Sequence, residues 1–204
     1  MKIILFGGLC YAGKTYIADT LCDHNKKYVK TSFASALKNE LHDAGIIDKK
    51  LLSDKKYKSS VRGIMQRYEQ EKRAADPFYL ARIVAAQIPN TPEAIVLIDD
   101  WRFKNEAKHL INAGHEVLKV YVKRSDYNKL NSVGKATLTD YYKNHHNEIS
   151  EQELWCASKE WIDGAPYFDL IYYNNTDGDK KRIIANLEKF INEGRRVKNY
   201  VMQG

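Results

Sequence analysis

Apolar and polar positions along the chain form blocks that predict strands and helices in alternation. Residues 3–6 form a short β run, and the apolar run at residues 94–98 lacks internal alternation, which is typical of a strand buried on both faces of a parallel sheet. Apolar residues recur at helical spacing over residues 17–22, 33–45 and 61–68. The alternation of the two element types predicts an α/β fold in which helices cover both faces of a parallel sheet.

The same patterns predict the remaining elements. Short β-prone runs lie at residues 28–31, 115–122 and 168–173, and helical patterns at residues 78–87, 106–113 and 180–191. Asp76-Pro77 is a typical helix start, with a capping side chain followed by proline in the first turn. The polar, lysine-rich residues 46–58 predict a surface excursion, and residues 125–150 are polar with little apolar periodicity.

Composition limits the class of protein. The 204 residues suit one compact domain spanning residues 1–204, with 44% apolar and 29% charged residues. No apolar stretch is long enough to cross a bilayer, and no secretory signal precedes the first strand, so we expect a cytoplasmic protein. The net charge of +7 suits anionic substrates such as nucleotides, and equally nucleic acid.

The first apolar run leads into a phosphate-binding motif. The eight residues from Gly8 to Thr15 match G-x-x-x-x-G-K-[ST] between a predicted strand and a predicted helix. Gly8 and Gly13 allow backbone N–H groups to turn around a phosphate. Lys14 reaches the β- and γ-phosphates, and the Thr15 hydroxyl binds Mg²⁺. The motif predicts a P-loop phosphotransferase that uses ATP and Mg²⁺.

A second group of candidates follows the apolar run at residues 94–98. Asp99 and Asp100 stand at the carboxyl end of this predicted strand, which is the ligand edge of an open α/β sheet. A carboxylate there can hold Mg²⁺ or its water, or orient an acceptor; alternatively, it caps a helix that starts near Phe103. Arg102 can bind a phosphate through two hydrogen bonds.

Basic and amide residues earlier in the chain form a third group. Arg62 and Gln66 are four residues apart and share one face of a predicted helix. With Lys38 and Arg73 they are candidates for the pocket of a second anionic substrate.

These segments together resemble the bacteriophage deoxynucleoside monophosphate kinases, a branch of the P-loop nucleoside monophosphate kinases. The most specific likeness is the stretch from Asp100 to Glu106, in which Asp100, Arg102, Phe103, Asn105 and Glu106 fit the pattern D-x-R-F-x-N-E. The other matching segments are the P-loop, residues 33–38, Arg62 with Gln66, the strand ending in Arg124, Ser150-Glu151 and residues 169–174.

The resemblance implies a role for each matching residue. It implies catalytic roles for Lys14, Asp100 and Arg124, and places Asn174 near the donor base. It implies a mobile lid over residues 124–151, whose polar sequence and positive charges suit a segment that closes over phosphates. The residues implied to contact the acceptor are Lys38, Arg62, Gln66, Tyr79, Asp100, Arg102 and Glu106.

The chain departs from this family at three places. The family often has Leu-Gly-Thr-Glu just after the position of Gln66, where this chain has Tyr68-Glu69-Gln70-Glu71. Glu148 stands where the family commonly has a histidine, and Tyr79 where it usually has a tryptophan. All three departures concern the acceptor side and the lid.

The leading hypothesis is a deoxynucleoside monophosphate kinase whose partners are small nucleotides, with a homodimer as one possible assembly and no membrane association. One alternative is a P-loop kinase that acts on a polynucleotide end or a modified base, which the positive charge permits. Another alternative is a nucleotide-dependent regulatory switch. The nearest string to its guanine-binding motif, residues 128–131, lacks the required aspartate.

Overall fold

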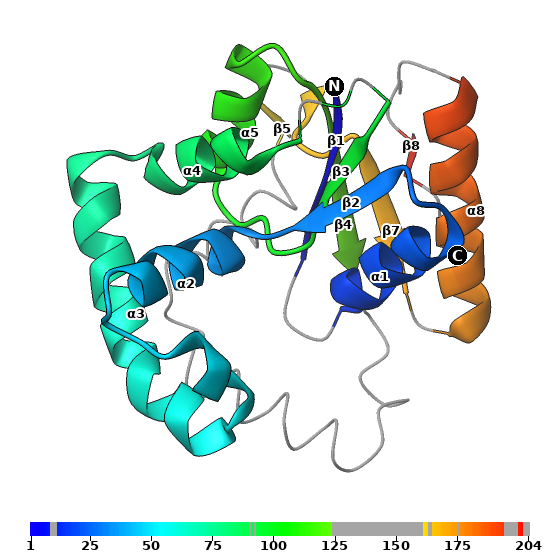
Figure 1. Ribbon diagram of the computed structural model, residues 1–204. Helices are drawn as coiled ribbons and strands as arrows, with labels where there is room; N and C mark the ends of the chain where they lie inside the picture. Colours follow the sequence, from blue (N-terminus) through cyan, green and yellow to red (C-terminus); the bar gives the residue numbers. More distant parts are fainter. Residues whose placement is uncertain are drawn as a thin grey trace.

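The computed structural model is built around a parallel β-sheet covered by helices on both faces (Figure 1). It describes residues 1–8, 12–89, 91, 93–123, 161–162, 165–174, 176–193 and 200–201. Arg124 and the predicted lid at residues 124–151 lie outside these residues. Within the described part, no helix is long and apolar enough to cross a membrane.

The main sheet has six strands in the order β2-β3-β1-β4-β7-β8, and every neighbouring pair is parallel. The central strand, β1, pairs with β3 on one side and β4 on the other, so that Ile4 lies opposite both Leu97 and Leu118. The strands are β1 (Lys2–Gly7), β2 (Tyr28–Thr31), β3 (Ile95–Ile98), β4 (Glu116–Lys123), β7 (Leu170–Tyr173) and β8 (Tyr200–Val201). A separate antiparallel pair consists of β5 (Trp161–Ile162) and β6 (Ala165–Pro166).

The helices divide between the two faces of the sheet. Side chains of β1 alternate, with Ile3 and Leu5 packing toward α2, α4 and α5, and Ile4 and Phe6 packing toward α1 and α8. The helices are α1 (Lys14–His24), α2 (Phe33–Asp43), α3 (Lys55–Ala75), α4 (Tyr79–Gln87), α5 (Lys104–Asn112) and α8 (Asp177–Glu193). This arrangement confirms the predicted α/β fold with a parallel sheet and helices on both faces.

The segment at residues 46–58 is more ordered than its composition predicted. It contains a short 3₁₀ helix, η1 (Lys49–Ser53), and the first turn of α3. Two aspartates explain the difference, because Asp48 accepts a hydrogen bond from the N–H of Lys50 (2.9 Å) and Asp54 accepts one from that of Tyr57 (2.8 Å). Helix α3 therefore begins at Lys55 and extends beyond the sheet (Figure 1).

Two glycines of the phosphate-binding motif have positive φ angles and neighbours that exclude a side chain. Gly8 has φ +130°, and a Cβ added there would lie 2.2 Å from the carbonyl oxygen of Val122. Gly13 has φ +93°, and its Cβ would lie 2.3 Å from Nδ2 of Asn174. Both positions therefore require glycine for two independent reasons, backbone conformation and space.

Replacing Gly8 tests this packing. We expect Gly8→Ala to lower the free energy of unfolding by about 2 kcal/mol or more, because the new methyl group meets backbone atoms of β4 that cannot move aside. The matched control is Gly63→Ala in exposed α3, where a Cβ meets nothing within 4 Å. That change should raise stability by about 0.5–1 kcal/mol. Urea unfolding measures both, and equal stability of Gly8→Ala and the wild type would contradict the prediction.

Candidate active site

The phosphate-binding motif occupies the turn between β1 and α1. Helix α1 starts at Lys14 with no acidic residue in its first turn and no side chain capping its N-terminus. Its first backbone N–H groups and the positive end of its dipole therefore remain available to an anion. Nζ of Lys14 donates a hydrogen bond to the carbonyl of Gly8 (2.6 Å), which holds the ammonium group over the turn.

Asn174 supports this turn from the neighbouring strand end. It follows β7, is only 1% exposed, and its Nδ2 donates to the carbonyl of Ala12 (2.6 Å). Its own backbone N–H donates to the carbonyl of Lys123 at the end of β4 (2.8 Å). The structure thus brings Asn174 to the end of the phosphate-binding motif, where it holds the carbonyl of Ala12 just before Gly13 and Lys14.

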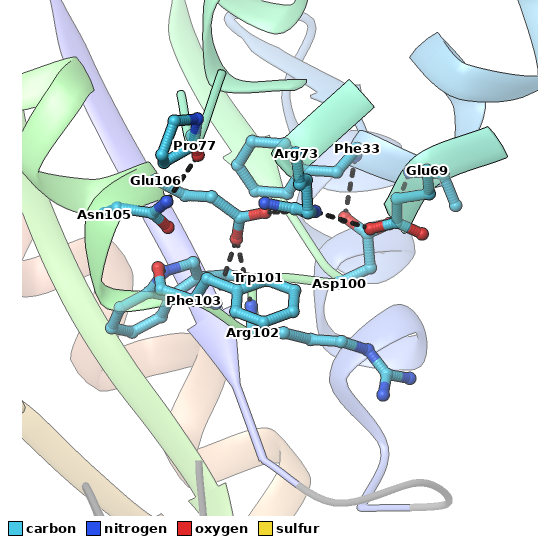
Figure 2. Close-up of polar contacts among 11 residues, drawn as sticks. Phe33, Glu69, Arg73, Pro77, Asp100, Trp101, Arg102, Phe103, Asn105 and Glu106 are labelled. Atoms are coloured by element: carbon cyan, nitrogen blue, oxygen red, sulfur yellow. Dashed lines mark hydrogen bonds and ion pairs between the residues drawn. The ribbon is translucent and has the colours of Figure 1, made fainter. Parts of the chain in front are cut away.

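The two acids after β3 lie on opposite faces of the sheet. Asp99 is on the α1 face, where its Oδ2 lies 3.5 Å from Nζ of Lys30, which also contacts Asp19 of α1. Asp100 is on the other face, where its two oxygens accept from the N–H groups of Phe33 (2.9 Å) and Ala34 (2.8 Å) (Figure 2). Burial raises the pKa of Asp100, while these two hydrogen bonds oppose that shift.

This geometry changes the interpretation of the pair. The family resemblance implied a catalytic role for Asp100, and the alternative was that an acid at this position caps a helix near Phe103. Asp100 does cap a helix, but the helix is α2, and α5 is capped instead by Glu106. Asp99 shares the α1 face with Thr15 and has the hard oxygen donors that suit Mg²⁺, so it joins Thr15 as a candidate metal-binding residue.

A pocket of about 380 Å³ lies beyond the carboxyl end of β3, between α2, α3 and the segment that leads into α5. Six of the seven residues expected to contact the acceptor line it: Lys38, Arg62, Gln66, Asp100, Arg102 and Glu106. Phe33, Leu37, Met65, Leu80 and Phe103 provide apolar surface. The volume and the mixture of apolar walls with a few polar groups are typical of a small-molecule site.

Tyr79 is the exception among those seven residues. It lies outside the pocket lining, and its hydroxyl donates to the carboxylate of Glu40 on α2. Tyr68 donates to the same carboxylate (2.8 Å). In this structure Tyr79 therefore joins helices α2 and α4 rather than facing the pocket.

One end of the pocket is strongly basic. Lys38 of α2 lines it together with Lys55, Lys58 and Arg62 of α3. Burial lowers the pKa of Lys38, and the positive charge of Lys58 lowers it further. A bound phosphate would relieve this repulsion and favour the charged lysine, so this end is suited to a phosphate group.

The other end is held by one guanidinium between two carboxylates. Figure 2 shows Arg73 reaching Glu106 through Nη2 (2.6 Å) and Glu69 through Nε (2.8 Å). The guanidinium also lies over the ring of Phe103, 4.1 Å from its centre. Glu106, only 1% exposed, additionally accepts from the N–H groups of Arg102 (3.2 Å) and Phe103 (3.1 Å). Burial raises the pKa of Glu106, and these three donors oppose the shift by stabilising its ionised form.

Some lining residues were not candidates in the sequence analysis. Lys58 and Glu69 lie on the same face of α3 as Arg62, Gln66 and Arg73, at spacings of three and four residues. That helical spacing is the signal that could have identified them. Phe33 and Phe103, by contrast, reach the pocket from segments that only the tertiary fold brings together.

Comparison with known proteins agrees with a kinase. The model of a family described as phosphomevalonate kinase matches residues 6–116, more than half of the chain. No curated protein matches the chain.

Solved structures that match the chain are distant in sequence. A protein described only as a candidate kinase from Chloroflexus aurantiacus is 14% identical, with a TM-score of 0.53, and the match covers 95% of this chain and 97% of that one. Kti12 from Chaetomium thermophilum, in complex with ADP-AlF3, is 11% identical with a TM-score of 0.49, over 92% and 97% of the two chains. Dephospho-CoA kinase from Campylobacter jejuni is 14% identical with a TM-score of 0.48, over 95% and 99%. At these identities the first match supports the fold alone.

The pair of Arg73 and Glu106 gives a test of the pocket structure. We expect Arg73→Met to cost about 3 kcal/mol of stability, because it leaves the Glu106 carboxylate buried without its cation. Combining it with Glu106→Gln should cost clearly less than the sum of the single changes.

The control is Arg82→Met, which removes an ion pair between Asp76 and an arginine that is 60% exposed, and should cost less than Arg73→Met, about 1 kcal/mol. Chemical unfolding of the four variants gives the coupling energy between Arg73 and Glu106. Additive single changes would show that the two side chains do not depend on each other.

Proposed function

We propose that this chain, which belongs to the phosphomevalonate kinase family and is a P-loop small-molecule kinase, acts on a deoxynucleoside monophosphate. The γ-phosphoryl group of ATP is transferred to the phosphate of that acceptor. The products are ADP and the deoxynucleoside diphosphate. The observation that carries the proposal is the pocket beyond β3, which has a basic end for a phosphate and a polar, aromatic end for a base.

On the donor side, the first turn of α1 binds the triphosphate. Its backbone N–H groups and Lys14 neutralise the β- and γ-phosphates. Thr15 and Asp99 would hold Mg²⁺, which supplies charge neutralisation between the phosphates when bound. Asn174 keeps the turn in the conformation that these contacts need.

On the acceptor side, Lys38, Arg62 and Arg102 hold the phosphate that is attacked. An oxygen of this phosphate forms the new bond to the γ-phosphorus as the bond between that phosphorus and the bridging oxygen of ADP breaks. The attacking oxygen already carries negative charge, so no side chain must remove a proton from it. The protein's task is therefore to position the two substrates and to neutralise their charge.

The name of the family gives a second candidate, phosphomevalonate as acceptor. Its phosphate suits the same basic end. Its carboxylate, however, would meet Glu69 and Glu106 at the other end, where both already share the single positive charge of Arg73. A base with N–H donors and a flat apolar surface fits that end better, beside Phe33 and Phe103.

An assay of ADP release with ATP and Mg²⁺ tests the proposal directly. The acceptors to compare are the deoxynucleoside monophosphates, the ribonucleoside monophosphates, phosphomevalonate and a short oligonucleotide with a 5′-hydroxyl end. We expect turnover with at least one deoxynucleoside monophosphate and none with the oligonucleotide. Turnover with phosphomevalonate alone would establish the second candidate, and turnover with the oligonucleotide alone would establish a polynucleotide kinase.

Lys14 is the residue on which phosphoryl transfer should depend most. We expect Lys14→Ala to lower kcat by at least about 100-fold, because its ammonium group stabilises charge that develops in the transition state. The matched control is Lys26→Ala, at an exposed lysine just beyond α1, which should leave kcat unchanged. Steady-state kinetics and circular dichroism check activity and folding, and near-normal kcat for Lys14→Ala would contradict the P-loop assignment.

Arg62 and Arg102 should act on the acceptor rather than on ATP. We expect Arg62→Ala and Arg102→Ala each to raise the KM for the acceptor by about 10-fold or more, through loss of a charged hydrogen bond to its phosphate. The dissociation constant of ATP should stay within about two-fold of the wild type. Arg67→Ala, on the exposed part of the same helix, is the control. Weaker ATP binding with an unchanged acceptor KM would place these arginines on the donor side.

A further inference from the structure

Three carboxylates line the pocket, and one of them differs from the others. Asp100 uses both oxygens to accept backbone N–H groups of α2, and Glu106 uses both for Arg73 and for the start of α5. Glu69 uses only Oε1, which accepts from Nε of Arg73 (2.8 Å). Among the residues that the structure describes, Oε2 of Glu69 has no hydrogen-bond partner. It is therefore the carboxylate oxygen of this pocket that carries no hydrogen bond from the described residues, and both of its lone pairs are available to a ligand.

The neighbours of Glu69 fix its position. Arg73 is one turn further along α3 and is itself held by the buried Glu106 and by the ring of Phe103. The Glu69 side chain is 29% exposed and lines the pocket, so it can contact a molecule there. A group held in this way loses little conformational entropy when it binds a ligand.

Glu69 also lies at a suitable distance from the phosphate-binding end. It is seven residues, or two helical turns, after Arg62, which is about 10 Å along the helix axis. That separation is comparable to the distance from the phosphate of a mononucleotide to the far edge of its base. Gln66 lies between them on the same face and lines the same pocket.

We propose that Glu69 is a specificity-determining residue that selects acceptors whose base carries an exocyclic amino group. The proposal rests on the function proposed above. A carboxylate can only accept hydrogen bonds, so it favours the amino group of cytosine, adenine or guanine. Uracil and thymine instead present carbonyl oxygens on each side of a single N–H, and these oxygens repel a carboxylate. Selection by a partly buried, fixed carboxylate of this kind is effective because the wrong base leaves it unpaired.

The test uses pairs of acceptors that differ by an amino group. These are dCMP against dUMP, and dAMP against dIMP, compared by kcat/KM in the coupled assay and by calorimetric binding in the absence of ATP. For the wild type we expect a preference of at least about 10-fold for the amino member of one pair, the size of effect given by a hydrogen bond to a charged group. In Glu69→Gln the preference should fall to within about three-fold, because an amide N–H can donate to the carbonyl of uracil or hypoxanthine.

Two further variants make the result specific. Glu69→Gln keeps an oxygen that can accept from Arg73, so it should fold, as thermal unfolding will check. Glu69→Asp keeps the negative charge and should retain the direction of the preference with lower kcat/KM. Glu71→Gln removes an exposed carboxylate from the same helix and should leave the preference unchanged.

The outcomes separate this inference from the proposed function. Equal use of both members of each pair by the wild type, or an unchanged preference in Glu69→Gln, would overturn the role of Glu69 while the kinase activity stands. If no mononucleotide is phosphorylated or bound, the proposed function fails, and the inference fails with it.

Discussion

The parallel pairing of β1 with β3 and β4 is the constraint on which the rest of the structure depends. Parallel strands all end at the same edge of a sheet, so the residues that follow each strand lie along that edge. The phosphate-binding turn after β1, the two aspartates after β3 and Asn174 after β7 meet there for this reason. The close contact of Gly8 with Val122 shows how little space the pairing leaves at that edge.

Three helices begin at this edge of the sheet, and their N-termini differ in whether a side chain caps them. Asp100 caps α2 and Glu106 caps α5, so the backbone N–H groups there already have partners. The start of α1 has no acidic residue and no capping side chain, which leaves it available to a phosphate. The two capped helices instead support the pocket, since α2 carries Lys38 and the cap of α5 holds Arg73.

The two ends of the pocket differ in charge: one carries lysines and arginines, and the other carries carboxylates around Arg73. Its basic end suits any phosphomonoester, which both a nucleotide and phosphomevalonate contain, so that end cannot separate the two candidates. The other end can separate the two candidates, because Arg73 there already binds two carboxylates and is not available to the carboxylate of phosphomevalonate. Glu69 belongs to residues 68–71, where the sequence departs from the deoxynucleoside monophosphate kinases that it resembles. Of these four residues, the structure places Glu69 in the wall of the pocket.

The sequence by itself determined the P-loop, the chain order of the longer strands and helices, and the α/β class, because these depend on local spacing and on periods of two and 3.6 residues. The short strands β5, β6 and β8 were not predicted. It also identified six pocket residues from a pattern and a resemblance. Only the tertiary structure decided which acid faces the P-loop helix. A strand buried on both faces has no polar side to show its phase, so Asp99 and Asp100 were indistinguishable in the sequence. Two other contacts likewise depend on where distant elements meet, which no local pattern encodes. They are the hydrogen bond of Tyr79 to Glu40 and the ion pair of Arg73 with Glu106, 33 residues away.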